Sequence, residues 1–466
     1  MKKPQENEIW EAVIERFEQQ TPASVMARMV LEEALPAKWI DEVFEAHRGQ
    51  QYARKLMLST VVELMTLVTL GLRPSLHAAA RQSRSLPVSV AALYEKVRGT
   101  QPELLRALVQ GSASRLGPVM DSLDRPSSLA GWRLRVVDGN HLARSEKRLG
   151  VLRGKRGAAL PGHSLVVYDP DEALVRDLVA CEDEYESERV GVMPLVEGSR
   201  PGELWVADSH FCTRGLLQGW QDTGASFIVR EHGRHPKVGE RGQWSAAQGS
   251  DTGRVRECAI TLQALRGQAR ACTAWRCIEI ELDEPTESGS KVLRLWSNLP
   301  ATVEAPTIAA LYRKRWRIEG MFGRLESVLH SEIKTLGHPR AALLGFTVAV
   351  LAYNVLALLQ AVVEQAHRPA MPELEVSPFH LAQHVKEGFE GLLVAVPPQQ
   401  WSGRAEPSPE HLARRLLELA MRLPARKLAT AKRGPKVAAA KGWVDGRTAR
   451  SHFSTARVLK AAGRSP

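Results

Sequence analysis

Three acidic residues stand where a carboxylate is costly unless it binds something. Asp138 ends the run "LRVVDG" and Asp208 ends "LWVADS", each in register with two apolar residues of a strand pattern. An acid that continues an apolar strand face needs a hydrogen bond or a cation. Glu319, in "RWRIEG", lies by helical spacing beside an apolar stripe. Simpler explanations exist, because aspartates often cap turns and Glu319 can pair with Arg315 four residues earlier.

Together the three acids predict a site for hard divalent cations. Carboxylate oxygens are ligands that Mg²⁺ prefers. Two such ions held by Asp138, Asp208 and Glu319 are typical of in-line displacement at phosphorus. The stretch "LYRKRWRIEG", which contains Glu319, also carries four Lys or Arg side chains, and these suit a polyanionic substrate. The pattern therefore predicts phosphoryl transfer on nucleic acid.

The elements that must position these acids have a mixed α/β layout. From Trp132, three β-type runs precede an alternation of helix and strand, and the two aspartates end strands of this series. A small all-β insertion is predicted from about 234 to 298. A long helix is predicted from near Thr307 to about Lys334, and it carries Glu319. Gly320 would be easier to understand there if another backbone approached closely.

The patterns divide the chain into five regions. They are an N-terminal helical domain (1–125), a first core part with Asp138 and Asp208 (126–233), the β insertion (234–300), a second core part with Glu319 (301–370), and a C-terminal helical segment with a basic tail (371–466). Two short helical segments in "PSLHAAARQSRSLPVSVAALYEKVRG" are compatible with a helix-turn-helix that binds DNA, although short helical hairpins are common.

Composition narrows the class of protein. At 44% hydrophobic and 25% charged residues the chain is typical of a globular protein, and its N-terminus lacks a signal-peptide pattern. The run Leu343–Leu359 approaches membrane-span length but contains Tyr353 and Asn354, which favours a buried helix and no membrane partner. The five cysteines are odd in number and show no C-x-x-C spacing, so a zinc ribbon or disulfide framework is not expected and a reducing cytoplasm is.

The net charge of +11 is concentrated at the C-terminus. Residues 422–466 hold 12 lysines and arginines and one acid, Asp445, while the rest of the chain is formally neutral. This basic tail favours a nucleic-acid partner over a merely solubilising role. By contrast, the acidic run "CEDEYESE" is predicted to be a solvated loop. His141 and His210, near the two aspartates, are predicted to be structural or solvent-facing rather than bound to metal or phosphate.

The stretch "YRKRWRIE" resembles the Tyr-x2-Arg-x3-Glu signature of DDE transposases of the insertion-sequence-four family. Tyr312, Arg315 and Glu319 match that signature. Asp138 in "VVDGNHL" and Asp208 in "VADSHF" look like the two aspartates of the family. The stretch "FIVREHGRHPK", which includes Arg230, is similar to the family's sequence after the second aspartate. The resemblance covers about 130 to 350.

The resemblance implies an RNase H-like core with a β-strand insertion. The three acids would bind two Mg²⁺ ions, with Mn²⁺ as a substitute, and water would attack at the transposon end to free a 3′-hydroxyl that then attacks DNA. Tyr312 and Arg315 would hold the backbone near the cleaved phosphate. The implied partners are double-stranded DNA, both terminal inverted repeats and target, and a second protomer in a paired-end complex. The implied setting is the prokaryotic cytoplasm, at the nucleoid.

One departure from the family is the residue seven positions after the catalytic glutamate. The family has lysine there, and this chain has Glu326. Arg324 or Lys334 could approach DNA instead, and Arg317 is also predicted to contact DNA. Trp275 and Trp296 could stack on a flipped base, as in some relatives, or belong to the core. Two other functions stay open, namely an RNase H-like nuclease that does not transpose and an inactive DNA-binding repressor.

Overall fold

The computed structural model describes residues 3–51, 55–83, 86–263, 274–286, 289–401, 408–431, 443–444, 447–448 and 461. The chain has two compact units, Met1–Ala429 and Thr430–Pro466. Most of the basic tail and Cys272 lie outside the described residues. The second unit contributes a short antiparallel pair, β11 (Trp443–Val444) and β12 (Arg447–Thr448). The division into five regions stays a prediction.

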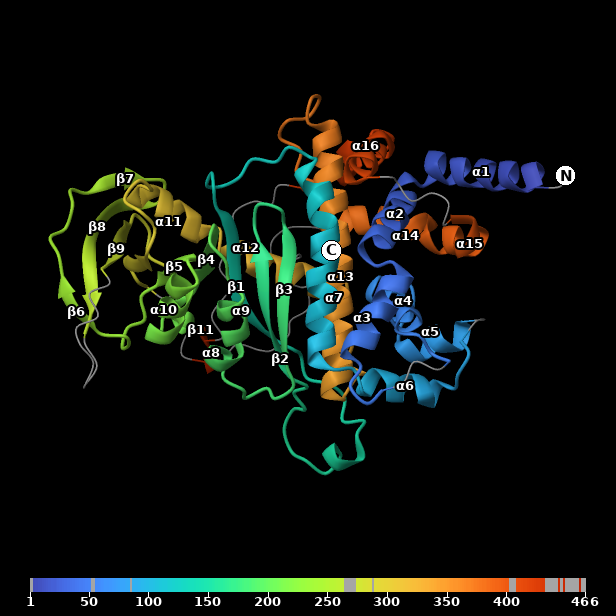
Figure 1. Ribbon diagram of the computed structural model, residues 1–466, viewed down its shortest axis with the longest axis horizontal. Helices are drawn as coiled ribbons and strands as arrows, with labels where there is room; N and C mark the ends of the chain where they lie inside the picture. Colours follow the sequence, from blue (N-terminus) through green and yellow to red (C-terminus); the bar gives the residue numbers. More distant parts are fainter. Residues whose placement is uncertain are drawn as a thin grey trace. The chain divides into compact units, whose positions relative to one another are not determined.

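A mixed sheet forms the centre of the first unit (Figure 1). Its strand order is β3-β2-β1-β4-β5-β10-β9-β8-β6, with β7 paired to β8. β1 runs antiparallel to β2 and parallel to β4, and β4 runs parallel to β5. The strands are β1 (Arg133–His141), β2 (His163–Asp169), β3 (Leu174–Cys181), β4 (Glu203–Ala207), β5 (Ser226–Arg230), β6 (Val238–Arg241), β7 (Gln248–Ser250), β8 (Gly253–Leu262), β9 (Trp275–Leu282) and β10 (Val292–Ser297). The predicted mixed α/β class is confirmed.

The strands between 234 and 300 continue this sheet. β10 pairs antiparallel with β5, and β9 and β8 follow outward. Burial alternates along β8 but changes phase at Glu257, so Val255 belongs to one apolar cluster and Ile260 to the other. The region predicted as an all-β insertion is therefore joined edge to edge with the strands that carry the acids.

The N-terminal region is helical, as predicted. It contains α1 (Lys3–Gln20), α2 (Pro22–Ala34), α3 (Ala37–His47), α4 (Leu58–Thr69), α5 (Leu76–Gln82), α6 (Val90–Arg98) and α7 (Pro102–Asp121). The two short segments expected near the Ser/Arg/Pro break are α5 and α6. Ser75 and Ser89 cap them by accepting hydrogen bonds from the backbone of the first turn. Their proposed contact with DNA stays a prediction.

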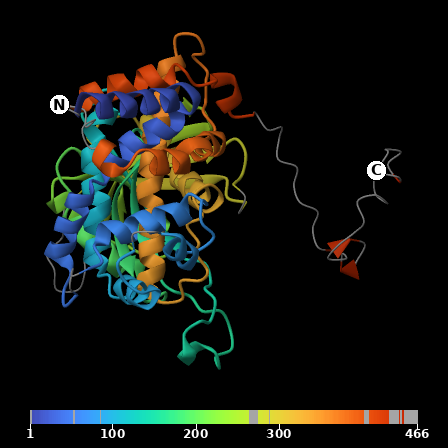
Figure 2. The same cartoon turned by 90° about the vertical axis from the view of Figure 1, so that its right-hand side faces the viewer.

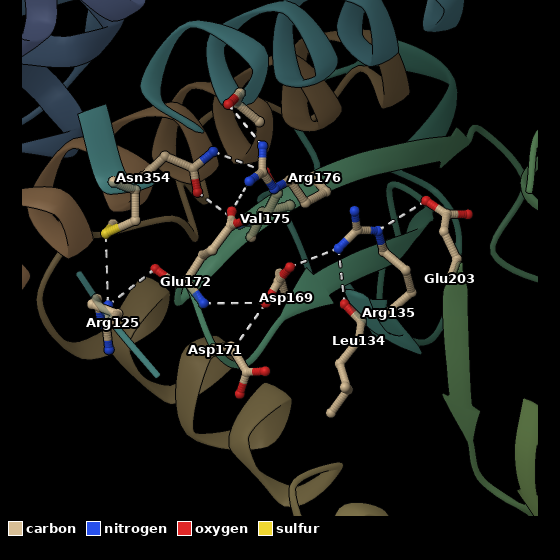
Figure 3. Close-up of polar contacts among 12 residues, drawn as sticks. Arg125, Leu134, Arg135, Asp169, Asp171, Glu172, Val175, Arg176, Glu203 and Asn354 are labelled. Atoms are coloured by element: carbon tan, nitrogen blue, oxygen red, sulfur yellow. Dashed lines mark hydrogen bonds and ion pairs between the residues drawn. The ribbon is translucent and has the colours of Figure 1, made fainter. Parts of the chain in front are cut away.

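Helices α7 and α13 (Pro339–His367) cover one face of the sheet at β3 (Figure 1). By length and composition α13 could cross a membrane, but 94% of its most apolar window is buried inside the fold. Asn354 of α13 accepts a hydrogen bond from the Val175 backbone nitrogen at 2.8 Å and donates one to the Val175 oxygen at 2.9 Å (Figure 3). Asn354, a polar residue in this apolar helix, thus gives hydrogen-bond partners to the backbone N–H and C=O of Val175 in the edge strand β3.

The remaining helices surround this centre. On the other face of the sheet lie α8 (Glu188–Gly191), α9 (Met193–Glu197) and α10 (Arg214–Asp222), around an apolar cluster that includes Trp205 and Trp220. The C-terminal helices are α14 (Pro378–Ala395), α15 (Pro398–Trp401), α16 (Pro409–Ala420) and α17 (Ala425–Leu428). Helix α16 lies beside α1 (Figure 2), and Arg415 binds Glu18 at 2.6 Å. The first and sixteenth helices are therefore held in one unit.

The prediction of one long helix from Thr307 to Lys334 is wrong. The chain forms α11 (Ala305–Arg313) and α12 (Trp316–Ser327), with a tight turn between them. At the break, the Arg315 nitrogen bonds the Tyr312 oxygen at 3.0 Å, a three-residue spacing. The side chain of Lys314 reaches Asp171 at 3.2 Å, so the turn between β2 and β3 anchors the break. Tertiary contacts override helix propensity here.

Candidate active site

Asp138 and Asp208 lie on neighbouring parallel strands. Val136 of β1 pairs with Val206 of β4, and each aspartate comes two residues later. Adjacent strands are about 4.8 Å apart, so the two carboxylates meet at the carboxyl edge of the sheet. Their Oδ1 atoms accept hydrogen bonds from backbone nitrogens, of Gly139 at 3.0 Å and of His210 at 2.8 Å. Turn capping thus accounts for one oxygen of Asp208. The strand end predicted at Asp138 is wrong, because β1 continues to His141 and Gly139 still pairs with Leu165 of β2.

Arg315 links the helix acid to the strand acid. Its Nη1 donates to Asp138 Oδ2 and its Nη2 to Glu319 Oε1, both at 3.1 Å. The Arg315 side chain is only 14% exposed. The break between α11 and α12 places Arg315 at the start of α12, one turn before Glu319. Because one guanidinium contacts both carboxylates, Asp138 and Glu319 converge on a place that a cation can occupy.

The electrostatics show that all three acids share this place. Burial raises the pKa of Asp138 to about 6, the charge of Arg315 lowers it, and the charges of Asp208 and Glu319 raise it again. Repulsion among grouped carboxylates is what a bound cation relieves. Three hard, partly buried oxygen donors that repel one another fit a divalent ion such as Mg²⁺. The residues predicted to bind metal are therefore chemically suited to it.

Two of the residues predicted to contact DNA gather with Arg315 around the acids. Burial raises the pKa of the Tyr312 hydroxyl, while Arg315 and Arg230 lower it and Asp208 raises it. Tyr312 also shares a hydrogen bond with Arg315. Arg230 ends β5, the strand next to β4. Tyr312, Arg315 and Arg230 thus lie near Asp208, and Arg315 contacts two of the carboxylates directly.

The other two predicted DNA contacts lie elsewhere on the unit. Arg317 is exposed and donates to the Pro170 oxygen at 2.9 Å. Lys334 is exposed in the loop after α12, where its backbone oxygen accepts from the Glu146 nitrogen at 2.9 Å. Glu326 is exposed. The partial burial of Glu332 raises the pKa of its carboxyl, and the nearby charge of Glu326 raises it further. The position where lysine was expected is therefore part of an acidic pair.

The segment between β1 and β2 is a cationic feature that the sequence reasoning missed. Residues 142–162 project from the unit, at the bottom of Figures 1 and 2. They follow Asp138 along the chain and contain six cations, Arg144, Lys147, Arg148, Arg153, Lys155 and Arg156, against one acid, Glu146. A charge count over this window would have found them. We call this segment the β1–β2 loop.

A basic cavity lies beyond the turn that Asp208 caps. It measures about 480 Å³ and is lined by Arg189, Cys212, Thr213, Arg214, His232, His235, Pro236, Lys237 and Gln263. No acid is among these described lining residues. Arg189 donates to the His210 oxygen at 2.8 Å, which holds it beside that turn. A cavity with this charge suits phosphate groups.

A larger cavity, of about 1090 Å³, lies at the opposite ends of β1 and β4. Its walls carry charges of both signs. Arg135 there binds Asp169 at 2.6 Å and Glu203 at 3.2 Å (Figure 3). These paired charges hold strands β1, β2 and β4 together, three residues before Asp138 along β1. The chemistry that the sequence predicts is therefore not in this larger cavity.

The aromatic residues separate into core and surface. Trp275 and Trp296 are buried, at 3% and 0% exposure, which favours the core alternative for both. Trp316 is 64% exposed, directly after Arg315 in the chain, and the sequence reasoning did not single it out.

The expectation of a close backbone near Gly320 is wrong, because among the described residues nothing lies within 4 Å of the position that a side chain would take there.

The comparison with protein families agrees with this geometry. Residues 135–355 match the family model described as Transposase DDE domain. No curated protein matches the chain. The match begins at the start of β1 and includes Asp138, Asp208 and Glu319. The matched residues, 135–355, are the part of the chain that brings the three acids together.

Proposed function

We propose that this protein is a transposase that binds transposon-end inverted repeats and carries out metal-dependent DNA strand cleavage and strand transfer. A transposase DDE domain implies a DNA transposition enzyme of a phosphoryl-transfer family. The observation that carries this proposal is the convergence of Asp138 of β1 and Asp208, which follows β4, with Glu319, which Arg315 links to Asp138. Cut-and-paste chemistry at both ends is the form of transposition we infer.

The strand order supports an RNase H-like core for this enzyme. β1, β2 and β3 form an antiparallel meander, and β4 and β5 then add parallel to β1. The spacing of Tyr312, Arg315 and Glu319 supports membership of the insertion-sequence-four family. The strands β6 to β10, which separate Asp208 from Glu319 in the chain, are compatible with a β insertion in such a core.

Asp138, Asp208 and Glu319 would hold two Mg²⁺ ions, or Mn²⁺ in their place. When bound, the ions would supply an activated water or 3′-hydroxyl and stabilise the leaving oxygen at phosphorus. Arg315 and Tyr312 would hold the DNA phosphate beside the acids, since a guanidinium binds phosphate with two donors. Partial burial of Asp138 strengthens these charge interactions by excluding water.

The DNA-binding surface would extend from the acids over the cationic features. The β1–β2 loop, Arg230 and the basic cavity all follow the ends of the strands that carry or neighbour the two aspartates. The exposed ring of Trp316 would offer a surface for base stacking. The basic tail, Arg317 and Lys334 would add further contacts. We infer a homodimer that pairs two DNA ends, working at the nucleoid in a prokaryotic cytoplasm.

A cleavage assay tests this proposal. Labelled DNA that carries the inverted repeats flanking the gene is incubated with Mg²⁺ and the wild type, Asp138→Ala, Asp208→Ala or Glu319→Ala. We expect cleavage at the repeat end by the wild type alone, with loss of at least 1000-fold in each variant (~4 kcal/mol of transition-state stabilisation). Asp222→Ala, an exposed acid on α10, is the matched control. Equal cleavage by wild type and all three variants would refute the proposal.

The same assay separates the alternative functions. A nuclease without transposition would cleave the end and leave the released 3′-hydroxyl unjoined to target DNA. A repressor would bind the repeats and cut nothing. The retention of three convergent acids favours an active enzyme over the repressor.

A further inference from the structure

A second group of ligand-type side chains lies on the opposite face of β1 from Asp138. Asp138 shares its strand face with Val136, whereas His141 shares the other face with Val137. The backbone register sets His141 opposite His163 of β2, and His163 opposite Cys181 of β3. Side chains directly opposite one another in a sheet lie on the same face. Three adjacent strands thus bring His141, His163 and the end of β3 together.

His163 is buried without a hydrogen-bond partner. Its side chain is 0% exposed, and among the described residues neither ring nitrogen has a partner. A buried polar group in that state costs free energy unless something binds it. The Oε2 atom of Glu184, three residues after β3, is likewise buried and unpartnered among the described residues. Two unsatisfied ligand-type groups therefore lie in one small region.

The ligand atoms of the group are close enough to bind one ion. His141, His163 and Glu184 each offer one atom, and these atoms lie within 4.8 Å of one another. The rings of His141 and His163 have centroids 5.3 Å apart. His141 Nδ1 lies 2.8 Å from Glu184 Oε1. His141 is exposed and His163 buried, so the group opens toward solvent on one side.

A further acid supports the group from outside. Glu188 Oε1 lies 3.6 Å from His141 Nε2, and Glu188 Oε2 lies 3.4 Å from His210 Nε2. Carboxylates in such places orient histidine ligands in metal sites. The acidic run was predicted to be a solvated loop, and this is wrong for Glu184 and Glu188, which turn toward the histidines. His210 is half exposed, as expected for a solvent-facing residue. His141 is also half exposed, but its ring contacts Glu184.

We propose that His141, His163 and Glu184 bind a divalent transition-metal ion of the zinc class. Two imidazoles and one carboxylate suit Zn²⁺, with water as a fourth ligand on the open side, whereas an all-oxygen set suits Mg²⁺. The ion would tie β1, β2 and the segment after β3 together at the end of the strand that carries Asp138. The inference does not depend on the proposed function, because it concerns metal binding alone.

Cobalt spectroscopy of the full-length, metal-free protein tests the site. Co²⁺ in a four-coordinate site with histidine ligands absorbs visible light much more strongly than hexahydrated Co²⁺. We expect one equivalent of Co²⁺ to produce this band in the wild type, Zn²⁺ to abolish it, and excess Mg²⁺ to leave it unchanged. Asp208→Asn should keep the band, because its acid belongs to the other site.

Variants of the ligands give the decisive comparison. We expect Glu184→Gln and His163→Gln to bind Co²⁺ more than tenfold more weakly, and Zn²⁺ to raise the melting temperature of the wild type but not of Glu184→Gln. His380→Gln, an exposed histidine on α14, is the matched control and should bind as the wild type does. If His163→Gln does not fold, Glu184→Gln decides the question. A wild type without the band, or a Glu184→Gln variant with unchanged Co²⁺ affinity, would overturn the proposal.

Discussion

Burial and the charge of Arg315 act in opposite directions on the carboxyl group of Asp138. Asp138 continues an apolar strand face, and burial raises the pKa of its carboxyl from 3.8 to about 6. Arg315 contacts it at 3.1 Å but also contacts Glu319, so one cation is shared between two acids. A carboxylate held in this way costs stability in the metal-free protein, which is typical of residues kept for function rather than folding.

The stability of the metal-free protein should therefore depend on pH through Asp138. Because the folded pKa is raised, the stabilising effect of protonation is full below roughly pH 4 and is lost as the pH rises through about 6. Relative to Asp138→Asn, the wild type should lose up to about 3 kcal/mol of unfolding free energy between roughly pH 4 and pH 7. Thermal unfolding of both proteins in EDTA at several pH values measures this. A difference that stays constant with pH would contradict the burial of Asp138.

Arg315 should not be replaceable by lysine. Its two nitrogens contact two different carboxylates, and a lysine ammonium lacks that planar fork. We expect Arg315→Lys to fold and to cleave transposon-end DNA at least tenfold more slowly (about 1.4 kcal/mol). Arg313→Lys is the matched control, since Arg313 pairs with Asp251, which is 82% exposed. Equal rates for the two variants would show that the double contact has no role.

At the scale of elements, two connections matter more than the helices and strands they join. The turn between α11 and α12 sets where Arg315 and Glu319 point, and contacts to the β2–β3 turn hold it. The β1–β2 loop, which contains six cations, projects from the unit directly after the strand that carries Asp138. Loops carried by a rigid sheet commonly hold binding residues.

The β1–β2 loop should contribute measurably to the salt dependence of DNA binding. Each phosphate contact adds about 0.9 to the slope of log affinity against log salt concentration. Changing Arg153, Lys155 and Arg156 together to glutamine should lower that slope by as much as ~2.7. The control changes three exposed cations far from β1 in the chain, Lys38, Arg368 and Arg414, to glutamine. An unchanged slope for the loop variant would place the DNA elsewhere.

Local pattern was enough to predict part of this arrangement. Strand alternation placed Asp138 and Asp208 on strand faces and correctly put Asp208 at the end of β4, but β1 continues three residues beyond Asp138. The Tyr-Arg-Glu spacing singled out Glu319. The break at Lys314 and Arg315 could not be predicted, because it depends on Asp171 and Pro170, which are far away in the sequence. The histidine group was missed for the same reason, since only the register of β1, β2 and β3 brings His141, His163 and Glu184 together.

At the scale of the whole molecule, the two units have different compositions. Residues 1–429 contain the sheet, both apolar clusters and the three acids. Residues 430–466 contain nine lysines and arginines and one acid. The first unit has its own core, and the basic tail is rich in charge but poor in large apolar residues, so folding and part of the DNA affinity should be separable.

Removal of residues 430–466 should leave the first unit folded and weaken DNA binding. We expect an unchanged circular dichroism spectrum, a melting temperature within a few degrees of the full chain, and at least tenfold lower affinity for DNA at low salt (about 1.4 kcal/mol). Titration of labelled repeat DNA at several salt concentrations measures the affinity. If the shortened protein binds DNA as tightly as the full chain, the tail has another role.

The central claim is that the three acids hold the ions that act on DNA, and a change of ligand softness tests it most directly. Mg²⁺ binds thiolate ligands poorly, whereas Mn²⁺ accepts them more readily. We predict that Asp208→Cys cleaves repeat-end DNA at least 100-fold more slowly than the wild type with Mg²⁺ (about 2.7 kcal/mol) and regains much of its activity with Mn²⁺. Asp222→Cys should cleave normally with either ion. Wild-type activity of Asp208→Cys with Mg²⁺, or no recovery with Mn²⁺, would contradict direct binding of the metal by Asp208.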